Sequence, residues 1–148
     1  MNASDMDLSK FSETLEELMF YKGINATQLS EEIGLDLSAI TQYLQQKHAP
    51  LTSSLVLLAD YFGVTCDFLL GIDTENAATE FKIRPSFGER LSELAKGGKI
   101  AEFCDRAGIS TSQFYRWKNG ENQPTVYNLC KIAKSLDRSV DFVLGREK

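Results

Sequence analysis

Residues 101–145 read AEFCDRAGISTSQFYRWKNGENQPTVYNLCKIAKSLDRSVDFVLG, and this stretch decides the fold. Its apolar residues recur three or four positions apart, which places them on one face of an α-helix, and no part alternates with the period of a strand. Gly108 interrupts the pattern, and Ser110 followed by Gln113 is a helix start signal. The helix that starts there cannot continue through Pro124. The stretch therefore predicts two short helices joined by a tight turn, then a loop and two further helices.

The same pattern occurs a second time upstream. Residues 29–71 read LSEEIGLDLSAITQYLQQKHAPLTSSLVLLADYFGVTCDFLLG and match the later stretch at a constant offset of 74 residues. The matching pairs are Gly34 and Gly108, Pro50 and Pro124, Leu55 and Leu129, Ala59 and Ala133, and Gly71 and Gly145. Nearer the N-terminus the offset becomes 76, so the later copy lacks two residues between its first and second helices. A register held over about sixty residues indicates an internal repeat.

The repeat predicts an all-α protein made of two tandem five-helix domains. The predicted domains are residues 1–72 and 84–148, joined by a polar linker at 73–83 with an ordered piece around Phe81 and Ile83. In the first copy, the first helix has an inward face and ends at Gly23, and the next two helices have cap residues. The inward residues are Leu8, Phe11, Leu15 and Leu18, and the predicted caps are Asn25 and Asp36. Thr125 and Ser139 are the caps predicted for the last two helices of the second copy.

The third helix of the second copy carries side chains suited to a DNA groove. If Phe114 and Trp117 face the core, the helix start points a polar set outward, and hydrogen-bond donors follow at its end. The outward set is Thr111, Ser112, Gln113 and Arg116, and the donors are Lys118, Asn119 and Asn122. Gln pairs with adenine, Arg with guanine, and Ser or Thr with base edges or phosphate. Donors at the helix end bind phosphate and set the register on the duplex.

Two alternatives remain open for these residues. Gln113 can serve only as the capping partner of Ser110, and Arg116 can form a surface ion pair with Glu121.

The two quoted stretches resemble the lambda-repressor/Cro-like (XRE) helix-turn-helix family. The resemblance covers nearly the whole chain outside the linker, and Gly108, Arg116-Trp117, Gly120 and Pro124 follow that family's turn, recognition helix and loop. It implies sequence-specific binding to duplex DNA, usually by a homodimer on a palindromic operator. The family usually begins its second helix with a Gln that braces phosphate, whereas Ala26 and Ile100 stand at those positions here.

The corresponding helix of the first copy is less suited to DNA. Its outward positions contain no Arg, and the nearest cation is Lys47, beside His48. The outward positions are Leu37, Ser38, Ala39, Thr41 and Gln42, and with Lys47 they form a second candidate surface, for DNA or for a protein partner.

The two copies differ in net charge. Residues 1–72 hold three Lys or Arg against ten Asp or Glu, a net charge of −7, whereas residues 84–148 hold twelve against eight, a net charge of +4. The overall charge of −5 conceals this asymmetry. DNA repels an acidic domain and attracts a basic one, so we expect the second copy to make most of the DNA contact.

Composition excludes several other classes of protein. The chain has three scattered cysteines, one histidine and no glycine-rich phosphate loop, so we expect no metal site, no cofactor and no enzyme activity. No apolar run approaches the length of a membrane span, and the N-terminus has no signal peptide pattern. We therefore expect a cytoplasmic protein without membrane contact.

The sequence thus favours a repressor-like transcriptional regulator. In this hypothesis the second copy reads double-stranded DNA, and the first mediates self-association or contacts a protein partner. A variant has both copies reading adjacent half-sites. The alternative is a protein-interaction module, antirepressor-like or antitoxin-like, that has the fold without strong DNA binding.

Overall fold

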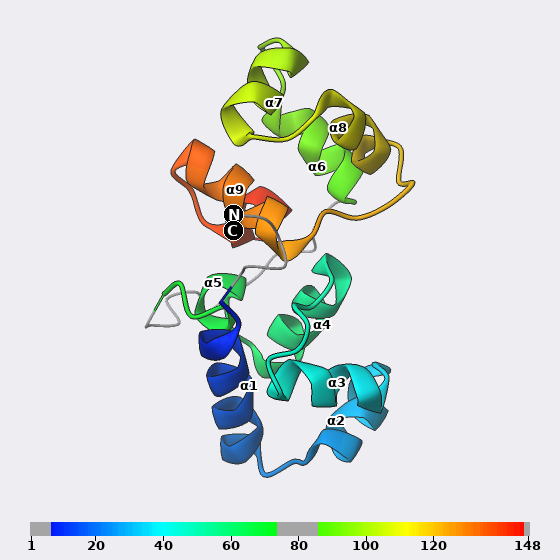
Figure 1. The fold of residues 1–148 in the computed structure, drawn as a ribbon, viewed down its shortest axis with the longest axis vertical. Coiled ribbons are helices and arrows are strands. Elements are labelled where there is room, and N and C mark those ends of the chain that lie inside the picture. Colours follow the sequence, from blue (N-terminus) through cyan, green and yellow to red (C-terminus); the bar gives the residue numbers. More distant parts are fainter. Residues whose placement is uncertain (1–6, 74–85, 147–148) are drawn as a thin grey trace. The chain divides into compact units, whose positions relative to one another are not determined.

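The computed structural model describes residues 7–73 and 86–146, and the regular structure in those residues is helical (Figure 1). The chain divides into two compact units, residues 1–79 and 80–148, called here the N-terminal and C-terminal units. Each has five helices within the described ranges, so the predicted all-α class is confirmed. Most of the predicted linker, with Phe81 and Ile83, lies outside the described residues. No helix within them is long and apolar enough to cross a membrane.

The N-terminal unit surrounds one apolar core. Its helices are α1 (Ser9–Lys22), α2 (Ala26–Ile33), α3 (Leu37–Leu44), α4 (Thr52–Phe62) and α5 (Cys66–Leu69). Helix α1 packs on α3 and α5, and α2 packs on α3 and α4. All five helices supply a fully buried side chain to the core: Leu15, Leu29, Ile40, Leu55 and Leu69.

The inward face of α1 differs slightly from the predicted one. The helix begins at Ser9, so Leu8 is its N-cap residue and only half-buried. The buried positions include Phe11, Leu15 and Met19, while Leu18 is half-buried. At 3.6 residues per turn these buried positions form an arc near Leu15, and Leu18 lies at its edge.

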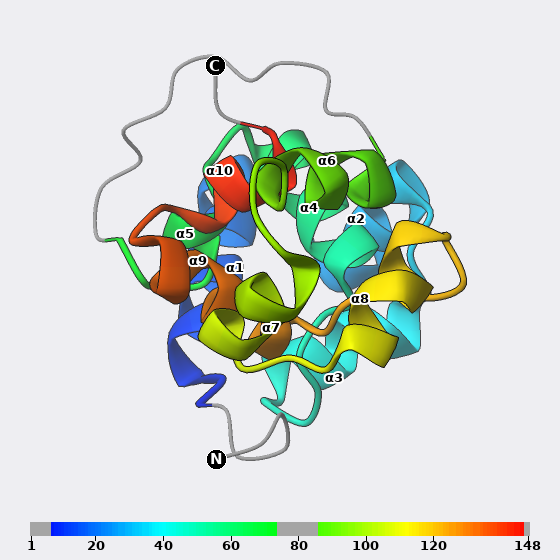
Figure 2. The same cartoon turned by 90° about the horizontal axis from the view of Figure 1, so that it is seen from above.

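The C-terminal unit repeats the arrangement. Its helices are α6 (Phe87–Leu94), α7 (Ile100–Ala107), α8 (Thr111–Lys118), α9 (Val126–Leu136) and α10 (Val140–Leu144). Helix α6 packs on α8 and on α10, which lies beside it in Figure 2, and α9 packs on α7 and α10. The Arg90 guanidinium joins α6 to α10, since its Nη2 donates to the Phe142 carbonyl at 2.6 Å.

Most of the predicted helix caps are present. Asn25 with Gln28, and Ser110 with Gln113, form reciprocal capping boxes, and Thr125 and Ser139 accept from Asn128 and Phe142. The predicted cap by Asp36 is wrong in one respect. Asp36 occupies the N-cap position of α3, but its side chain accepts no hydrogen bond there. The carboxylate is exposed, so water can hydrate it and can also accept from the unpaired N–H groups at the start of the helix.

The first helix differs between the two units. Helix α1 has 14 residues and α6 has 8. With the offset of 76 residues, the α6 end at Leu94 corresponds to Leu18, so α1 continues for one further turn. Where α1 continues, the C-terminal unit has Gly97 and Gly98, which favour chain breaks over helix.

Candidate nucleic-acid interface

Helices α7 and α8 are joined by a tight turn that the surrounding unit holds in place. Gly108 has a φ of 72°, a left-handed conformation that costs glycine little. Ile109 beside it is buried, and its N–H donates to the Cys104 carbonyl at 3.0 Å. The Lys131 ammonium of α9 donates to the Gly108 carbonyl at 2.6 Å. The angle between the two helices is therefore set by core packing and by a contact to a third helix.

Two buried aromatic side chains fix the rotation of α8. Phe114 is 1% exposed and meets the Phe103 ring of α7 edge-on, with 5.9 Å between ring centres. Trp117 is 4% exposed and meets Phe87 of α6 in the same way at 6.2 Å. Both therefore face the core, as the sequence predicts.

Because Phe114 and Trp117 face the core, the opposite side of α8 faces solvent. Of the seven predicted DNA-contact residues, six are exposed, namely Thr111, Ser112, Arg116, Lys118, Asn119 and Asn122. In the described residues Arg116 forms no ion pair, and its only contact with Glu121 is backbone, from the Glu121 N–H to the Arg116 carbonyl at 2.9 Å. The guanidinium is therefore available to a ligand.

Gln113 is the exception among the seven, because it is half-buried and works in the helix cap. Its Oε1 accepts from the Ser110 N–H at 3.1 Å, and its own N–H donates to Ser110 Oγ at 3.0 Å. Adenine recognition by glutamine uses that same amide oxygen as an acceptor. Capping and base reading therefore compete for one atom.

The outward side also includes a residue that the sequence reasoning missed. Tyr115 is 45% exposed on α8, and the Lys118 ammonium lies 5.8 Å from the centre of its ring. Tyr115 follows Thr111 by four residues and Ser112 by three, so helical spacing alone could have placed it with them.

Helix α6 approaches the end of α8 closely. A Cβ added to Gly88 would lie 2.4 Å from the Lys118 carbonyl oxygen, so only glycine fits there without movement. The equivalent residue in the N-terminal unit is Ser12, whose hydroxyl donates to the Tyr43 carbonyl of α3. Contact with the first helix thus positions the C-terminal part of the third helix in both units.

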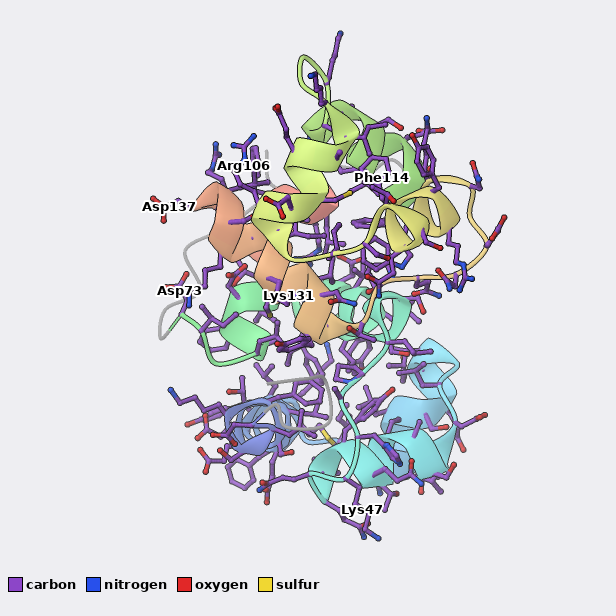
Figure 3. The ribbon with its side chains drawn as sticks, turned by 45° about the horizontal axis from the view of Figure 1, so that its top comes forward. Lys47, Asp73, Arg106, Phe114, Lys131 and Asp137 are labelled. Carbon is purple, nitrogen blue, oxygen red and sulfur yellow. The ribbon has the colours of Figure 1, made fainter. Side chains whose placement is uncertain are left out.

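The second candidate surface, on α3, is less accessible. Leu37 and Ser38 are exposed, but Ala39, Thr41 and Gln42 are half-buried. The Thr41 hydroxyl donates back to the Leu37 carbonyl at 2.9 Å. Lys47 lies beyond the helix end and projects outward from the N-terminal unit (Figure 3).

The buried cysteines do not contribute to the surface of α8. Cys66 and Cys104 lie in the two cores, and burial raises the pKa of the Cys104 thiol. In residues 7–73 and 86–146, no three His, Cys, Asp or Glu side chains are arranged so that they could hold a metal ion.

Comparison with known proteins gives two findings. A family model described as helix-turn-helix (HTH_3) matches residues 22–69 and 91–143, one match in each unit. The chain is also 41% identical over 60 residues to the cryptic phage CTXphi transcriptional repressor RstR of Vibrio cholerae serotype O1. The matched region is 39% of this chain and 54% of RstR, so the chain spans about half the length of that relative. No solved structure matches the chain.

Proposed function

Since the chain belongs to the helix-turn-helix family, we propose that it is a sequence-specific transcriptional regulator whose C-terminal unit reads double-stranded DNA. The observation that carries the proposal is the outward side of α8. Its buried partners Phe114 and Trp117 fix the helix, so Thr111, Ser112 and Arg116 face solvent with little freedom to rotate away. A short, rigid, polar helix of this kind fits the major groove.

In this proposal, base reading and docking use different parts of α8. Arg116 binds a guanine edge through two donors, and Thr111 and Ser112 contact neighbouring bases or phosphate. Lys118, Asn119 and Asn122 follow in the chain, where their donors bind phosphate oxygens and set the register. Gln113 chiefly stabilises the helix start, because its amide oxygen accepts from Ser110.

We assign the N-terminal unit a role in contacts with protein, either a second copy or a partner. Its residues up to 72 have a net charge of −7, which opposes binding to phosphate. Three of the five predicted outward positions on α3 are also only partly accessible. A homodimer presenting two copies of α8 would bind a palindromic site. Because RstR is named as a transcriptional repressor, repression is the regulatory direction we propose.

The test is selection of binding sites from a random duplex pool by the full chain and by an Arg116→Ala, Thr111→Ala variant. The matched control is Arg106→Ala, because Arg106 is also exposed but lies at the end of α7, away from α8 (Figure 3). We expect an enriched motif that the control retains and the double variant loses. If the full chain enriches no motif even at low salt, the proposal is wrong.

The second candidate function is a protein-interaction module without strong DNA binding. It is favoured by the overall charge of −5 and by Ala26 and Ile100, which begin α2 and α7 where the family usually has a phosphate-bracing Gln. Salt titration separates the two functions, because contact with several phosphates makes affinity fall steeply as salt rises. Affinity for a selected site that did not change with salt would favour the interaction module.

A further inference from the structure

The additional turn of α1 exposes two aromatic side chains. Phe20 is 79% exposed and Tyr21 is 83% exposed, the largest fractions among the exposed large hydrophobic residues described. Their rings pack edge-on at 5.8 Å. In the C-terminal unit the corresponding residues are Lys96 and Gly97. Exposed aromatic surface is unfavourable in water and is a common feature of interaction sites.

The turn that carries these rings is held firmly. Gly23 caps α1 in a left-handed conformation, and its N–H donates to the Phe20 carbonyl at 3.1 Å. The Ile24 N–H donates to the Met19 carbonyl at 3.1 Å, which completes the cap. The Lys22 ammonium lies 4.3 Å from the centre of the Tyr61 ring on α4. Phe20 and Tyr21 are therefore presented by a well-capped helix end.

Three carboxylates share the face of α1 that carries the two rings. Two rows with spacings of three and four run along this face, one through Glu13, Glu16 and Phe20 and one through Glu13, Glu17 and Tyr21. Together these five residues line a shallow depression of about 380 Å³. We call these five residues the acidic-aromatic face. It combines apolar area with negative charge, and its three glutamates are exposed.

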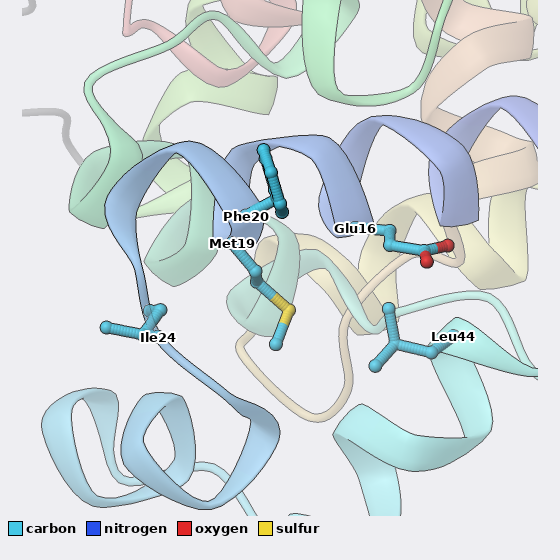
Figure 4. A pocket seen from close by; sticks show the side chains of 5 residues that line it. All are labelled: Glu16, Met19, Phe20, Ile24 and Leu44. Atoms are coloured by element: carbon cyan, nitrogen blue, oxygen red, sulfur yellow. The ribbon is translucent and has the colours of Figure 1, made fainter.

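An apolar groove adjoins the acidic-aromatic face and shares two residues with it. The groove has a volume of about 410 Å³ and is lined by Glu16, Met19, Phe20, Ile24 and Leu44 (Figure 4). Its walls come from α1, from the turn after α1 and from the end of α3. In the C-terminal unit, Lys96 stands in place of Phe20 and Lys118 in place of Leu44. Two apolar walls of the groove are therefore replaced by lysines at the equivalent positions of the C-terminal unit.

We infer that the acidic-aromatic face and its groove dock an amphipathic helix of another protein, one that carries Lys or Arg beside an apolar stripe. The inference rests on the protein-contact role proposed for the N-terminal unit. The apolar stripe would cover Phe20 and fill the groove, and the basic residues would lie against Glu13, Glu16 and Glu17.

A second copy of the chain is a poorer occupant than a basic helix. In a two-fold contact of the face with itself, glutamates would meet glutamates, and like charges oppose such contact. The basic C-terminal unit of a second copy also offers little apolar surface. Of the seven exposed large hydrophobic residues in the described ranges, only Tyr115 belongs to that unit.

The test uses synthetic helical peptides of about four turns with one leucine stripe, flanked by lysine in one peptide and by glutamate in the other. Fluorescence anisotropy measures their binding to the full chain. We expect the lysine peptide to bind at least about tenfold more tightly, and Phe20→Ala, Tyr21→Ala to weaken it by about tenfold or more. The matched control is Leu51→Ala, Leu57→Ala, which removes exposed apolar side chains elsewhere in the same unit.

A charge reversal distinguishes loss of the docking site from loss of the folded structure. The Glu16→Lys, Glu17→Lys variant should prefer the glutamate peptide, an exchange of preference that loss of structure cannot produce. The Arg116→Ala, Thr111→Ala variant should keep its peptide binding, so failure of the proposed DNA reading is distinguished from failure of this site.

Equal binding of both peptides, or unchanged binding after Phe20→Ala, Tyr21→Ala, would overturn the inference. So would sedimentation showing that the aromatic substitutions dissociate a dimer while the lysine peptide does not bind, because the occupant would then be a second copy.

Discussion

Helices α3 and α8 occupy the same place in their units, and each is anchored by two buried side chains one turn apart. The anchors are Ile40 and Tyr43 in α3, and Phe114 and Trp117 in α8. What the two helices present to solvent differs. Helix α8 presents Arg116 and Lys118, whereas the equivalent positions of α3 hold Gln42 and Leu44, both half-buried.

The comparison shows that one helical scaffold can hold two unlike surfaces. The inward positions must fill a closed core, so they stay apolar in both units, although their sizes differ, as at Ile40 and Phe114. The outward positions meet water and tolerate most side chains, so charge and shape can diverge there. Binding roles therefore have to be inferred from the surface of each unit separately.

The largest expected effect comes from removing a large buried side chain from one core while the other core stays unchanged. Phe114→Ala should destabilise the C-terminal unit by about 3–5 kcal/mol, because a large buried ring is lost and a cavity is left. The chain's one tryptophan, Trp117, lies in that unit, so its fluorescence in a urea titration follows the unfolding there. The equivalent Ile40→Ala should not move this transition. A shift with Ile40→Ala would mean that the units unfold together.

The next effect concerns DNA affinity. Arg116→Ala should weaken binding to the selected site by about 1–3 kcal/mol and relax the preference at one base pair, because it would remove the proposed two-donor contact to a base. The equivalent substitution in the N-terminal unit, Gln42→Ala, should leave affinity unchanged. Mobility-shift titrations on the site and its single-base variants measure both. Equal losses from the two substitutions would indicate that both units read DNA.

A third substitution tests the contact between the first and third helices. Gly88→Ala should destabilise the C-terminal unit by about 1–2 kcal/mol, since its Cβ would meet the Lys118 carbonyl at 2.4 Å. DNA binding should also weaken, because the end of α8 must move. The equivalent Ser12→Ala removes only a hydrogen bond to the Tyr43 carbonyl, worth about 1 kcal/mol. Urea titrations followed by circular dichroism give both values. If Gly88→Ala left the free energy of unfolding unchanged, α6 would be able to move away from the end of α8 at little cost.

The smallest effect separates two N-cap positions that look alike in sequence. Ser110→Ala should destabilise its unit by about 1 kcal/mol, because Ser110 Oγ accepts from the Gln113 N–H at 3.0 Å. Asp36→Ala should change stability by less than half of that, since the Asp36 side chain makes no such bond. Thermal unfolding of both variants measures the difference. A larger loss from Asp36→Ala would show that its carboxylate supports α3 through its charge.

Much of the fold and part of the candidate site could be predicted from sequence. The offset of 74 residues is read directly from the sequence. The left-handed turn at Gly108 and the capping boxes at Asn25 and Ser110 depend on contacts within a few residues. Helical spacing likewise predicted that Phe114 and Trp117 would be buried. The predicted resemblance to helix-turn-helix domains, in two copies, is confirmed by the family matches.

The remaining features of the site depend on neighbours that are distant in sequence. The contact between Gly88 and Lys118 joins α6 to α8, and the bond from Lys131 to Gly108 joins α9 to the turn. The groove beside Phe20 exists because Leu44 of α3 lines it together with residues of α1. None of these pairings leaves a periodic signal in the chain.

The sequence by itself thus determined the repeat, the helices, most of their caps and most of their inward positions, because local spacing and backbone hydrogen bonding control those features. Only the tertiary structure decided which outward residues are accessible. It half-buries Gln113 and Gln42, exposes Tyr115, and leaves Phe20 and Tyr21 uncovered at the end of α1. The physical reason is that exposure depends on what the other helices cover, and helix packing brings together residues that the sequence keeps apart.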